Sequence, residues 1–147
     1  MIDEKDKEII NVLIENSKLS YREIAQKTGL SAVTIMNRVK TLEKDGAIKS
    51  YTAEIDYEKI GYDVQVLIHM RIAKGRLFDV EQKIAVLKGV FAVYDVTGNF
   101  DAIIIAKFKN RRMMDAFLKK IQTFDFVERT ETNIILNTIK EKNIFVE

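Results

Sequence analysis

Apolar and polar residues alternate with the period of an α-helix in three short segments of the first fifty residues. The first segment, residues 3–16, begins with Asp3, whose side chain can cap a helix. It carries one stripe of apolar side chains at helical spacing: Ile9, Ile10, Leu13 and Ile14. Three such helices are expected to share a small core: Leu13, Ile24, Leu30, Ile35, Val39 and Leu42.

The second and third segments are joined by a glycine turn. Ser20 and Glu23 stand three residues apart, which is the spacing of a capping box at a helix start. Gly29 is expected to end that helix in a left-handed conformation, and Ser31 can cap the third helix, which ends at Gly46. A helix, a tight turn and a second helix form the arrangement that enters the DNA major groove. Two amphipathic helices around a glycine also occur in proteins that never touch DNA.

Charge along the chain favours the DNA-binding interpretation. Residues 1–17 hold two Lys against five Asp and Glu, a net charge of −3. Residues 18–50 hold seven Lys and Arg against three Asp and Glu, a net charge of +4, although the whole chain carries only +2. Positive charge is therefore concentrated where DNA phosphates would lie.

The candidate DNA contacts on and around the third helix fall into two groups, phosphate contacts and base contacts. Five residues are expected to hold phosphates: Arg22, Ser31, Lys40, Lys44 and Lys49. Three in the N-terminal half of the helix are expected to meet base edges: Val33, Thr34 and Asn37. Arg38 and Thr41 flank this face. Lys40 and Lys44 could instead form an ordinary solvated face, and Arg38 could instead pair with a neighbouring carboxylate.

After the third helix the pattern changes from helical to strand-like. Residues 48–55 alternate apolar and polar positions, which predicts a short strand or wing. From residue 62 onward the periodicity predicts strand, helix, strand, strand, helix and strand, with Asn110 capping the second helix: 63–73, 78–87, 91–96, 100–108, 111–123 and 127–139. This order is the ferredoxin-like βαββαβ unit, with both helices on one face of the sheet.

The fold class predicted for the chain is therefore α+β. Residues 1–50 form a winged helix-turn-helix, residues 51–61 a linker or hinge strand, and residues 62–147 a ferredoxin-like domain. The predicted third strand is apolar on both sides, with Ala102, Ile104 and Ala106 on one side and Ile103 and Ile105 on the other. An open apolar sheet face marks an interface, and a second copy related by a two-fold axis is the expected partner. Such a homodimer would present two recognition helices about 34 Å apart, one turn of DNA.

Composition limits the chemistry available to the chain. None of the 147 residues is cysteine and only one is histidine, so we expect no disulfide, no metal site and no cofactor. No apolar run approaches the roughly 20 residues of a membrane span, and the charged N-terminus is unlike a signal peptide. A cytoplasmic location is therefore expected, without a membrane partner.

Four stretches of the chain, in order, resemble the Lrp/AsnC family of transcription regulators: IDEKDKEIINVL, SYREIAQKTGLS, TIMNRVKTLEKDGAIKSYTAEID and GNFDAIIIA. The resemblance implies a DNA-binding winged helix-turn-helix and a βαββαβ module that dimerises and commonly assembles into octamers. It also implies an amino acid or related small molecule as effector, bound between dimers.

The resemblance places the effector at one turn and one strand: Gly98, Asn99, Phe100, Asp101, Thr130 and Thr132. Asn99 stands where many members of the family carry an acid. Gly98 could instead be required only for a turn with positive φ, and Asp101 only to cap that turn. The lone histidine, His69, is expected to be a partly buried or interface side chain.

The function predicted from the sequence is a sequence-specific, DNA-binding transcription regulator without catalysis. An enzyme of similar scaffold is the alternative, because proteins resembling this family decarboxylate sirohaem with histidine and arginine chemistry. The single histidine disfavours that alternative. A co-regulator that binds metabolites without reading DNA is disfavoured by the basic face of the third helix.

Overall fold

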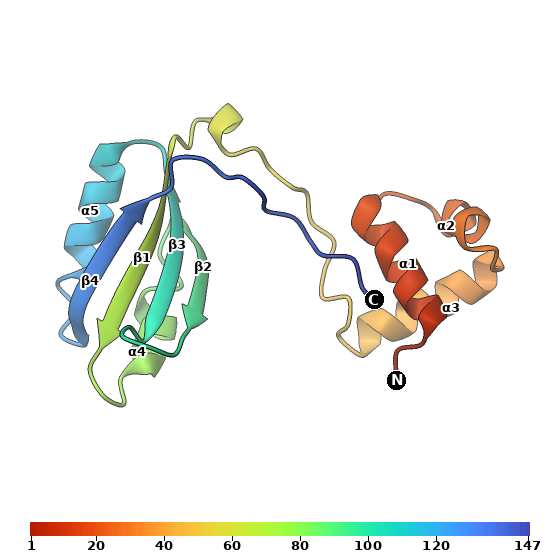
Figure 1. Ribbon diagram of the computed structural model, residues 1–147, viewed down its shortest axis with the longest axis horizontal. Coiled ribbons are helices and arrows are strands. Elements are labelled where there is room, and N and C mark those ends of the chain that lie inside the picture. Colours follow the sequence, from red (N-terminus) through yellow and green to blue (C-terminus); the bar gives the residue numbers. More distant parts are fainter. The chain divides into compact units, whose positions relative to one another are not determined.

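The computed structural model describes residues 1–147, which divide into two compact units. The helical unit comprises Met1–Glu54 together with Lys140–Glu147, and the sheet unit comprises Ile55–Ile139 (Figure 1). The last eight residues thus group with the first unit, whereas the sequence places them at the end of the second. None of the helices is both long and apolar enough to cross a membrane.

The helical unit consists of α1 (Glu4–Glu15), α2 (Tyr21–Thr28) and α3 (Ala32–Lys44). Each helix begins at the predicted cap: Asp3, Ser20 and Ser31 accept hydrogen bonds from backbone N–H groups three residues on. Gly29 ends α2 with φ +69°, as predicted. Four side chains are almost completely buried between the helices: Ile9, Ile24, Ile35 and Val39.

Two details of the helical unit differ from the sequence prediction. Leu13 and Leu30 lie at the edge of the core and are only partly buried, whereas Ile9 is fully buried. Residues 49–56 form no strand. Their side-chain hydrogen bond to α3 runs from the Tyr51 hydroxyl to Glu43 Oε1, at 2.8 Å. A strand requires a neighbour to share its backbone hydrogen bonds, and this chain supplies none to the wing segment.

The sheet unit has the predicted βαββαβ order, preceded by one 3₁₀ turn at Glu58–Ile60. Its strands are β1 (Val64–Ile72), β2 (Val90–Asp95), β3 (Ala102–Phe108) and β4 (Val127–Ile134). Its helices are α4 (Leu77–Lys83) and α5 (Arg111–Ile121), the latter capped by Asn110 as predicted. All pairs are antiparallel and the strand order is β2-β3-β1-β4, which confirms the ferredoxin-like fold.

Two elements of the sheet unit, α4 and β4, end well before the residue that the periodicity predicts. Helix α4 ends at Lys83 because the helical hydrogen-bond pattern breaks there: the Ala85 N–H donates to the Val80 carbonyl, five residues back, and the Leu87 N–H donates to the Ile84 carbonyl, three residues back. Strand β4 ends at Ile134, which pairs with Val66; beyond it the Ile135 N–H still donates to the Gln65 carbonyl at 2.8 Å, and the following residues form no ladder with β1.

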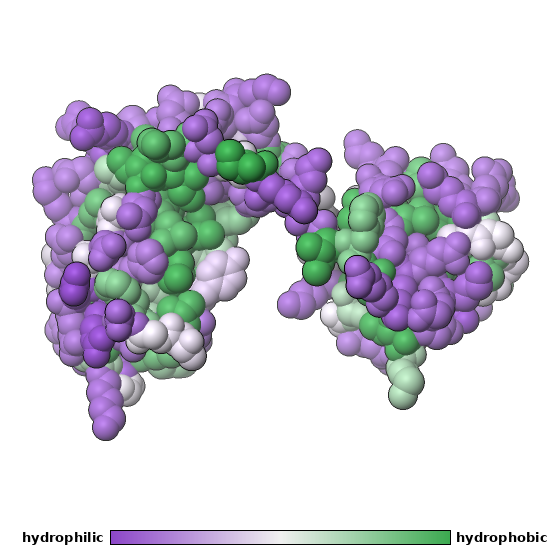
Figure 2. All heavy atoms as spheres, in the orientation of Figure 1, coloured by the Kyte–Doolittle hydropathy of each residue, from purple (hydrophilic) through white to green (hydrophobic).

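The sheet separates a covered face from an open one. Side chains alternate along β1, and Val66, Ile68 and Met70 are fully buried under the helices. On the other face Leu67 pairs with Ile105, and His69 pairs with Ile103, and all four are only half-buried. Figure 2 shows apolar side chains gathered on the sheet unit, on the face turned toward the viewer.

Candidate DNA-binding face and effector loop

The outer face of α3 is a continuous exposed surface. Its buried side carries Ile35, Val39 and Leu42, which anchor the helix to the rest of the unit. On the opposite side of the helix four side chains are exposed, as the helical period predicts: Val33, Asn37, Lys40 and Lys44. Thr41, on the flank, is exposed too. Val33 is 63% exposed, which is unusual for a valine inside a helix and leaves its methyl groups free for contact.

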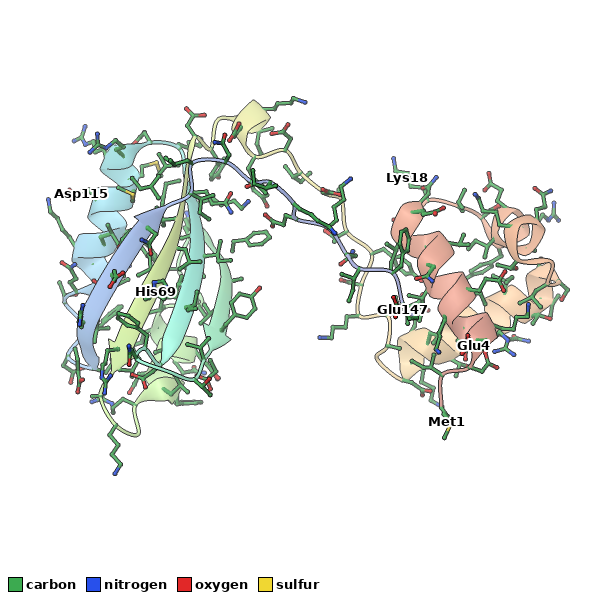
Figure 3. All side chains as sticks on the ribbon, viewed as in Figure 1. Met1, Glu4, Lys18, His69, Asp115 and Glu147 are labelled. Carbon is green, nitrogen blue, oxygen red and sulfur yellow. The ribbon has the colours of Figure 1, made fainter.

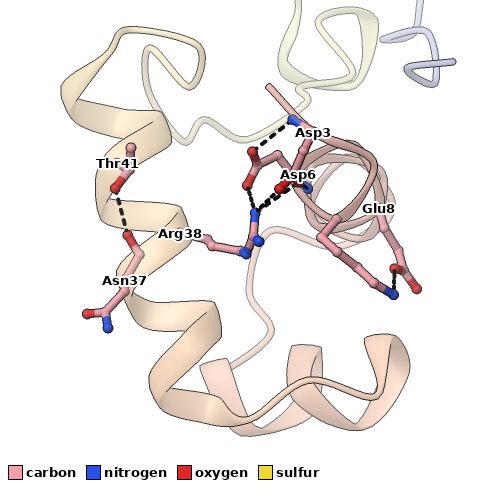
Figure 4. A network of polar contacts seen from close by, with 7 residues as sticks. Asp3, Asp6, Glu8, Asn37, Arg38 and Thr41 are labelled. Atoms are coloured by element: carbon pink, nitrogen blue, oxygen red, sulfur yellow. Dashed lines mark hydrogen bonds and ion pairs between the residues drawn. The ribbon is translucent and has the colours of Figure 1, made fainter. Parts of the chain in front are cut away.

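Two hydroxyl groups on α3 are used by the helix itself. The Ser31 Oγ accepts from the Thr34 N–H at 3.1 Å and shares a 2.8 Å hydrogen bond with the Thr34 hydroxyl. The Thr41 hydroxyl donates to the Asn37 carbonyl at 3.0 Å (Figure 4). The Asn37 side-chain amide makes no hydrogen bond within the protein, so both its donor and its acceptor are available.

Arg38 is held by the start of α1. Its Nη1 donates to Asp3 Oδ2 at 2.8 Å and to Asp6 Oδ1 at 2.8 Å (Figure 4). Hydrogen bonding to the carboxylates of Asp6 and Asp3 raises the pKa of Arg38, and the hydrogen bond that Arg38 donates lowers the pKa of Asp3. The structure therefore shows Arg38 in an ion pair with neighbouring carboxylates. Asp3 and Asp6 could not be recognised as its partners from sequence, because they lie more than thirty residues away.

The two remaining basic candidates lie outside α3. Arg22 is exposed in the first turn of α2, and Lys49 is exposed just after α3. Neither forms an ion pair within the protein, so no carboxylate of the chain competes with a phosphate for either side chain.

The turn between β2 and β3 is fixed by backbone contacts. Gly98 has φ +115°, a conformation that favours glycine. Asp101 Oδ2 accepts from the Ile72 N–H at 2.8 Å, and the Asp101 N–H donates to the Met70 carbonyl at 2.9 Å. Arg71 Nη1 donates to the Asn99 carbonyl at 2.8 Å. Asp101 thus joins this turn to the end of β1, which is a structural role.

An open hollow of about 600 Å³ lies beside this turn on the open face of the sheet. His69, Asn99, Phe100 and Ile103 line it together with the end of β2. The rings of His69 and Phe100 are 5.2 Å apart, and the buried Nδ1 of His69 has no hydrogen-bond partner. The Arg129 guanidinium lies 5.6 Å from the centre of the Phe100 ring.

The two threonines predicted for the effector site point elsewhere. Thr130 and Thr132 pair with Met70 and Ile68, whose side chains are buried under the helices. Gln122 Nε2, just after α5, donates to Thr130 Oγ1 at 3.4 Å. Both threonines therefore face the helix side of the sheet, whereas the hollow lies on the open side. The six predicted effector residues do not meet in one pocket of a single chain.

Comparison with known proteins covers both units. A family profile described as Winged helix-turn-helix DNA-binding matches residues 2–49, and one described as Lrp/AsnC ligand binding domain matches residues 65–145. An HTH-type transcriptional regulator of Pyrococcus abyssi is 44% identical over 141 residues, which is 96% of each chain.

Solved structures agree with these matches. Escherichia coli AsnC superposes with a TM-score of 0.90 at 27% identity, covering 99% of each chain. The fold is also that of a Neisseria meningitidis transcriptional regulator solved in complex with L-Met. Its TM-score is 0.87 at 24% identity, over 97% of this chain and 94% of that one. The chain therefore belongs to the Lrp/AsnC family, and it is a transcription regulator with a DNA-binding winged helix-turn-helix and a ligand-binding domain, not an enzyme.

Proposed function

We propose that the protein binds a specific operator as a homodimer and reads its base sequence with the outer face of α3. The observation that carries this proposal is the free side-chain amide of Asn37. It lies exposed in the N-terminal half of α3, between Val33 and Lys40. A side chain with a donor and an acceptor in one plane can bridge the N6 and N7 groups of adenine in the major groove.

The other residues of this face take roles that follow from their chemistry. Val33 meets a thymine methyl group through apolar contact. Lys40 and Lys44 neutralise phosphates at the side of the groove, which gives affinity without sequence information. The same role is proposed for three residues around the helix: Arg22, Ser31 and Lys49.

Three candidates contribute mainly through positioning. Arg38 ties α3 to Asp3 and Asp6 of the first helix, which fixes the angle at which α3 leaves the core. The Thr34 hydroxyl completes the cap with Ser31, so only its methyl group remains for a base. The Thr41 hydroxyl is bonded to the Asn37 carbonyl within α3.

A second copy is the proposed partner of the open sheet face. Leu67, Ile103 and Ile105 lie at its centre and are only half-buried in one chain. The His69 Nδ1 lacks a partner on the same face. A two-fold axis through this face would bury the apolar centre twice and present two α3 helices to successive major grooves. Further association into an octamer would extend the same arrangement along DNA.

We place an amino-acid effector at the turn formed by Gly98, Asn99, Phe100 and Asp101. The family profile describes this unit as a ligand binding domain, and the Neisseria structure makes L-methionine the first compound to test. Thr130 and Thr132 lie on the opposite face of the same sheet, so they join the site only if the ligand contacts more than one copy of the chain.

Footprinting on the promoter of the protein's own gene tests operator binding, with and without a panel of amino acids that includes L-methionine. Protection of a defined sequence, repeated once per DNA turn, is expected. Equal protection of every sequence in near-physiological salt would contradict the proposal. An amino acid that changes the footprint identifies the effector.

Two substitutions separate base reading from phosphate binding. Asn37→Ala should lower operator affinity about ten- to hundredfold, the scale of a bidentate base contact, and leave binding to random duplex unchanged. Lys40→Ala should weaken binding to both DNAs and reduce the salt dependence by about one ion. Lys74→Ala, an exposed lysine of the sheet unit, is the control. If Asn37→Ala weakens both DNAs equally, Asn37 does not read a base.

A further inference from the structure

The last residues of the chain are bound to α1 by one asparagine side chain. Asn11 Nδ2 donates to the Val146 carbonyl at 2.9 Å, and Asn11 Oδ1 accepts from the Val146 N–H at 2.7 Å. Figure 1 shows the C-terminal end of the chain lying beside α1. Figure 3 labels Glu147, the residue after this contact. Both hydrogen bonds lie within the helical unit, to which residues 140–147 belong.

This contact recognises the peptide backbone and not a particular side chain. An asparagine amide carries one donor face and one acceptor face, as a peptide group does, so it can pair with both groups of one residue in an extended segment. Peptides that add to a sheet edge are held by the same main-chain hydrogen bonds. The apolar side chains of the segment stay largely open, since Ile144 is 79% exposed and Phe145 is 57% exposed. Two neutral hydrogen bonds with little apolar burial give a weak and reversible attachment.

The position of this contact in the chain limits how freely the helical unit can move. The helical unit is connected to the sheet unit covalently after Glu54, and the docked segment makes a second connection after Ile139. A unit attached at two points has less conformational freedom than a unit attached at one. Less freedom in the free protein lowers the entropic cost of binding DNA with two recognition helices at once.

We propose that the C-terminal segment, residues 140–147, is a latch that docks on α1 through Asn11 and strengthens operator binding by restraining the DNA-binding unit. This proposal rests on the proposed operator binding. The occupant of the Asn11 site is the chain's own C-terminus, and the readout of docking does not require DNA.

Amide hydrogen exchange in the full-length protein tests the docking itself. The Val146 N–H should exchange about three- to tenfold faster in Asn11→Ala than in the unmodified protein, the scale of one lost hydrogen bond. Alanine is a better helix former than asparagine, so the substitution keeps α1 intact. Asn137→Ala is the matched control, since Asn137 is exposed and forms no hydrogen bond. Equal exchange of Val146 in all three proteins overturns the latch.

Operator affinity tests whether docking of the segment strengthens DNA binding. Asn11→Ala should weaken operator binding about three- to tenfold, and removal of residues 143–147 should weaken it by the same factor. The two changes combined should give no further loss, because they remove one interaction. Unchanged affinity in Asn11→Ala overturns the proposal, as does a combined loss equal to the sum of the two. A failure of the unmodified protein to select an operator contradicts the proposed function instead, while Val146 exchange still reports whether the segment docks.

Discussion

The contacts that stabilise the helical unit span short distances along the chain, whereas those that stabilise the sheet unit span long ones. Each helix of the first unit begins at a side-chain cap within three residues of the group it satisfies. In the second unit α4 has no side-chain cap, and the sheet joins residues as distant as Val66 and Ile134. The first unit is therefore specified largely by local sequence, and the second by pairing between distant segments.

The two units also differ in the size of their cores. The helical core contains four buried residues, whereas the core of the sheet unit contains fourteen. A small core leaves little reserve of stability, so each of its side chains carries a larger share. The two units also differ in the surface they expose. The helical unit presents a polar and basic helix face, while the sheet unit presents a half-buried apolar face. The difference fits the proposed roles, in which the helical unit reads DNA and the sheet unit forms the homodimer.

The largest expected effect comes from truncating one buried isoleucine side chain to alanine in each unit. Ile35→Ala and Ile104→Ala should each cost about 2–5 kcal/mol, since both side chains are fully buried. In the helical unit this loss should exceed the stability available, so that α1 to α3 unfold while the sheet persists. Ile104→Ala should leave a folded but less stable sheet unit. Calorimetry and far-ultraviolet circular dichroism measure both, and one shared transition with equal shifts would show that the units do not fold independently.

The second prediction places a charge on the open sheet face. Ile105→Glu should abolish the proposed dimer and lower operator affinity about a hundredfold, because an unpaired carboxylate opposes burial in an apolar interface. Each chain should still fold and should still bind random duplex through its basic residues. Light scattering gives the assembly state, and a mobility shift gives the affinity. Val86→Glu is the control, at an apolar residue that is already 74% exposed. A dimeric Ile105→Glu variant would place the interface elsewhere.

A smaller loss is expected from removing the cap of α3. Ser31→Ala should destabilise the helical unit by about 1 kcal/mol, because the Thr34 N–H loses its hydrogen-bond acceptor. Ser17→Ala should change stability by less than about 0.5 kcal/mol, since Ser17 is exposed and makes no hydrogen bond. Urea unfolding without DNA measures both. Equal stability of the two variants would mean that packing, and not the cap, decides where α3 begins.

The same difference in range explains which elements could be predicted from sequence. Capping residues such as Ser20 and Asn110, and the left-handed Gly29, act within one helical turn, and the structure confirms all three. The βαββαβ order also follows from periodicity. The ends of α4 and β4 do not, because the turns after Lys83 and the extent of pairing with β1 decide them. The predicted wing strand is absent because a strand depends on a partner segment.

In the candidate sites, too, features set by local spacing could be predicted and features set by distant residues could not. The exposed outer face of α3 was predictable, because helical spacing alone separates Asn37 and Lys40 from the buried Val39. The partners of Arg38 were not, since Asp3 and Asp6 approach it only after α1 and α3 pack. The latch at Asn11 was equally hidden, because its partner lies 135 residues away.

The smallest expected effect is a loss of stability of the helical unit in acid. The hydrogen bond from Arg38 lowers the pKa of Asp3, and the hydrogen bonds from Ser20 lower the pKa of Glu23. A carboxylate with a lowered pKa in the folded state stabilises the protein above its unfolded pKa, about 4. That stability is lost as the pH falls through the folded pKa. The effect should be small, because both carboxylates are exposed to solvent and screened by it.

Asp3→Asn isolates this contribution, because asparagine still caps α1 but offers Arg38 no charge. Unfolding of the helical unit, followed between pH 6 and pH 2 (about two units either side of a normal carboxylate pKa), should depend less on pH in Asp3→Asn than in the unmodified protein. The sheet unit should respond alike in both proteins, because Asp3 belongs to the other unit. An unchanged pH dependence would mean that the link between Asp3 and Arg38 adds no charge-dependent stability. Asp6 would then be the carboxylate that ties Arg38, and with it α3, to α1.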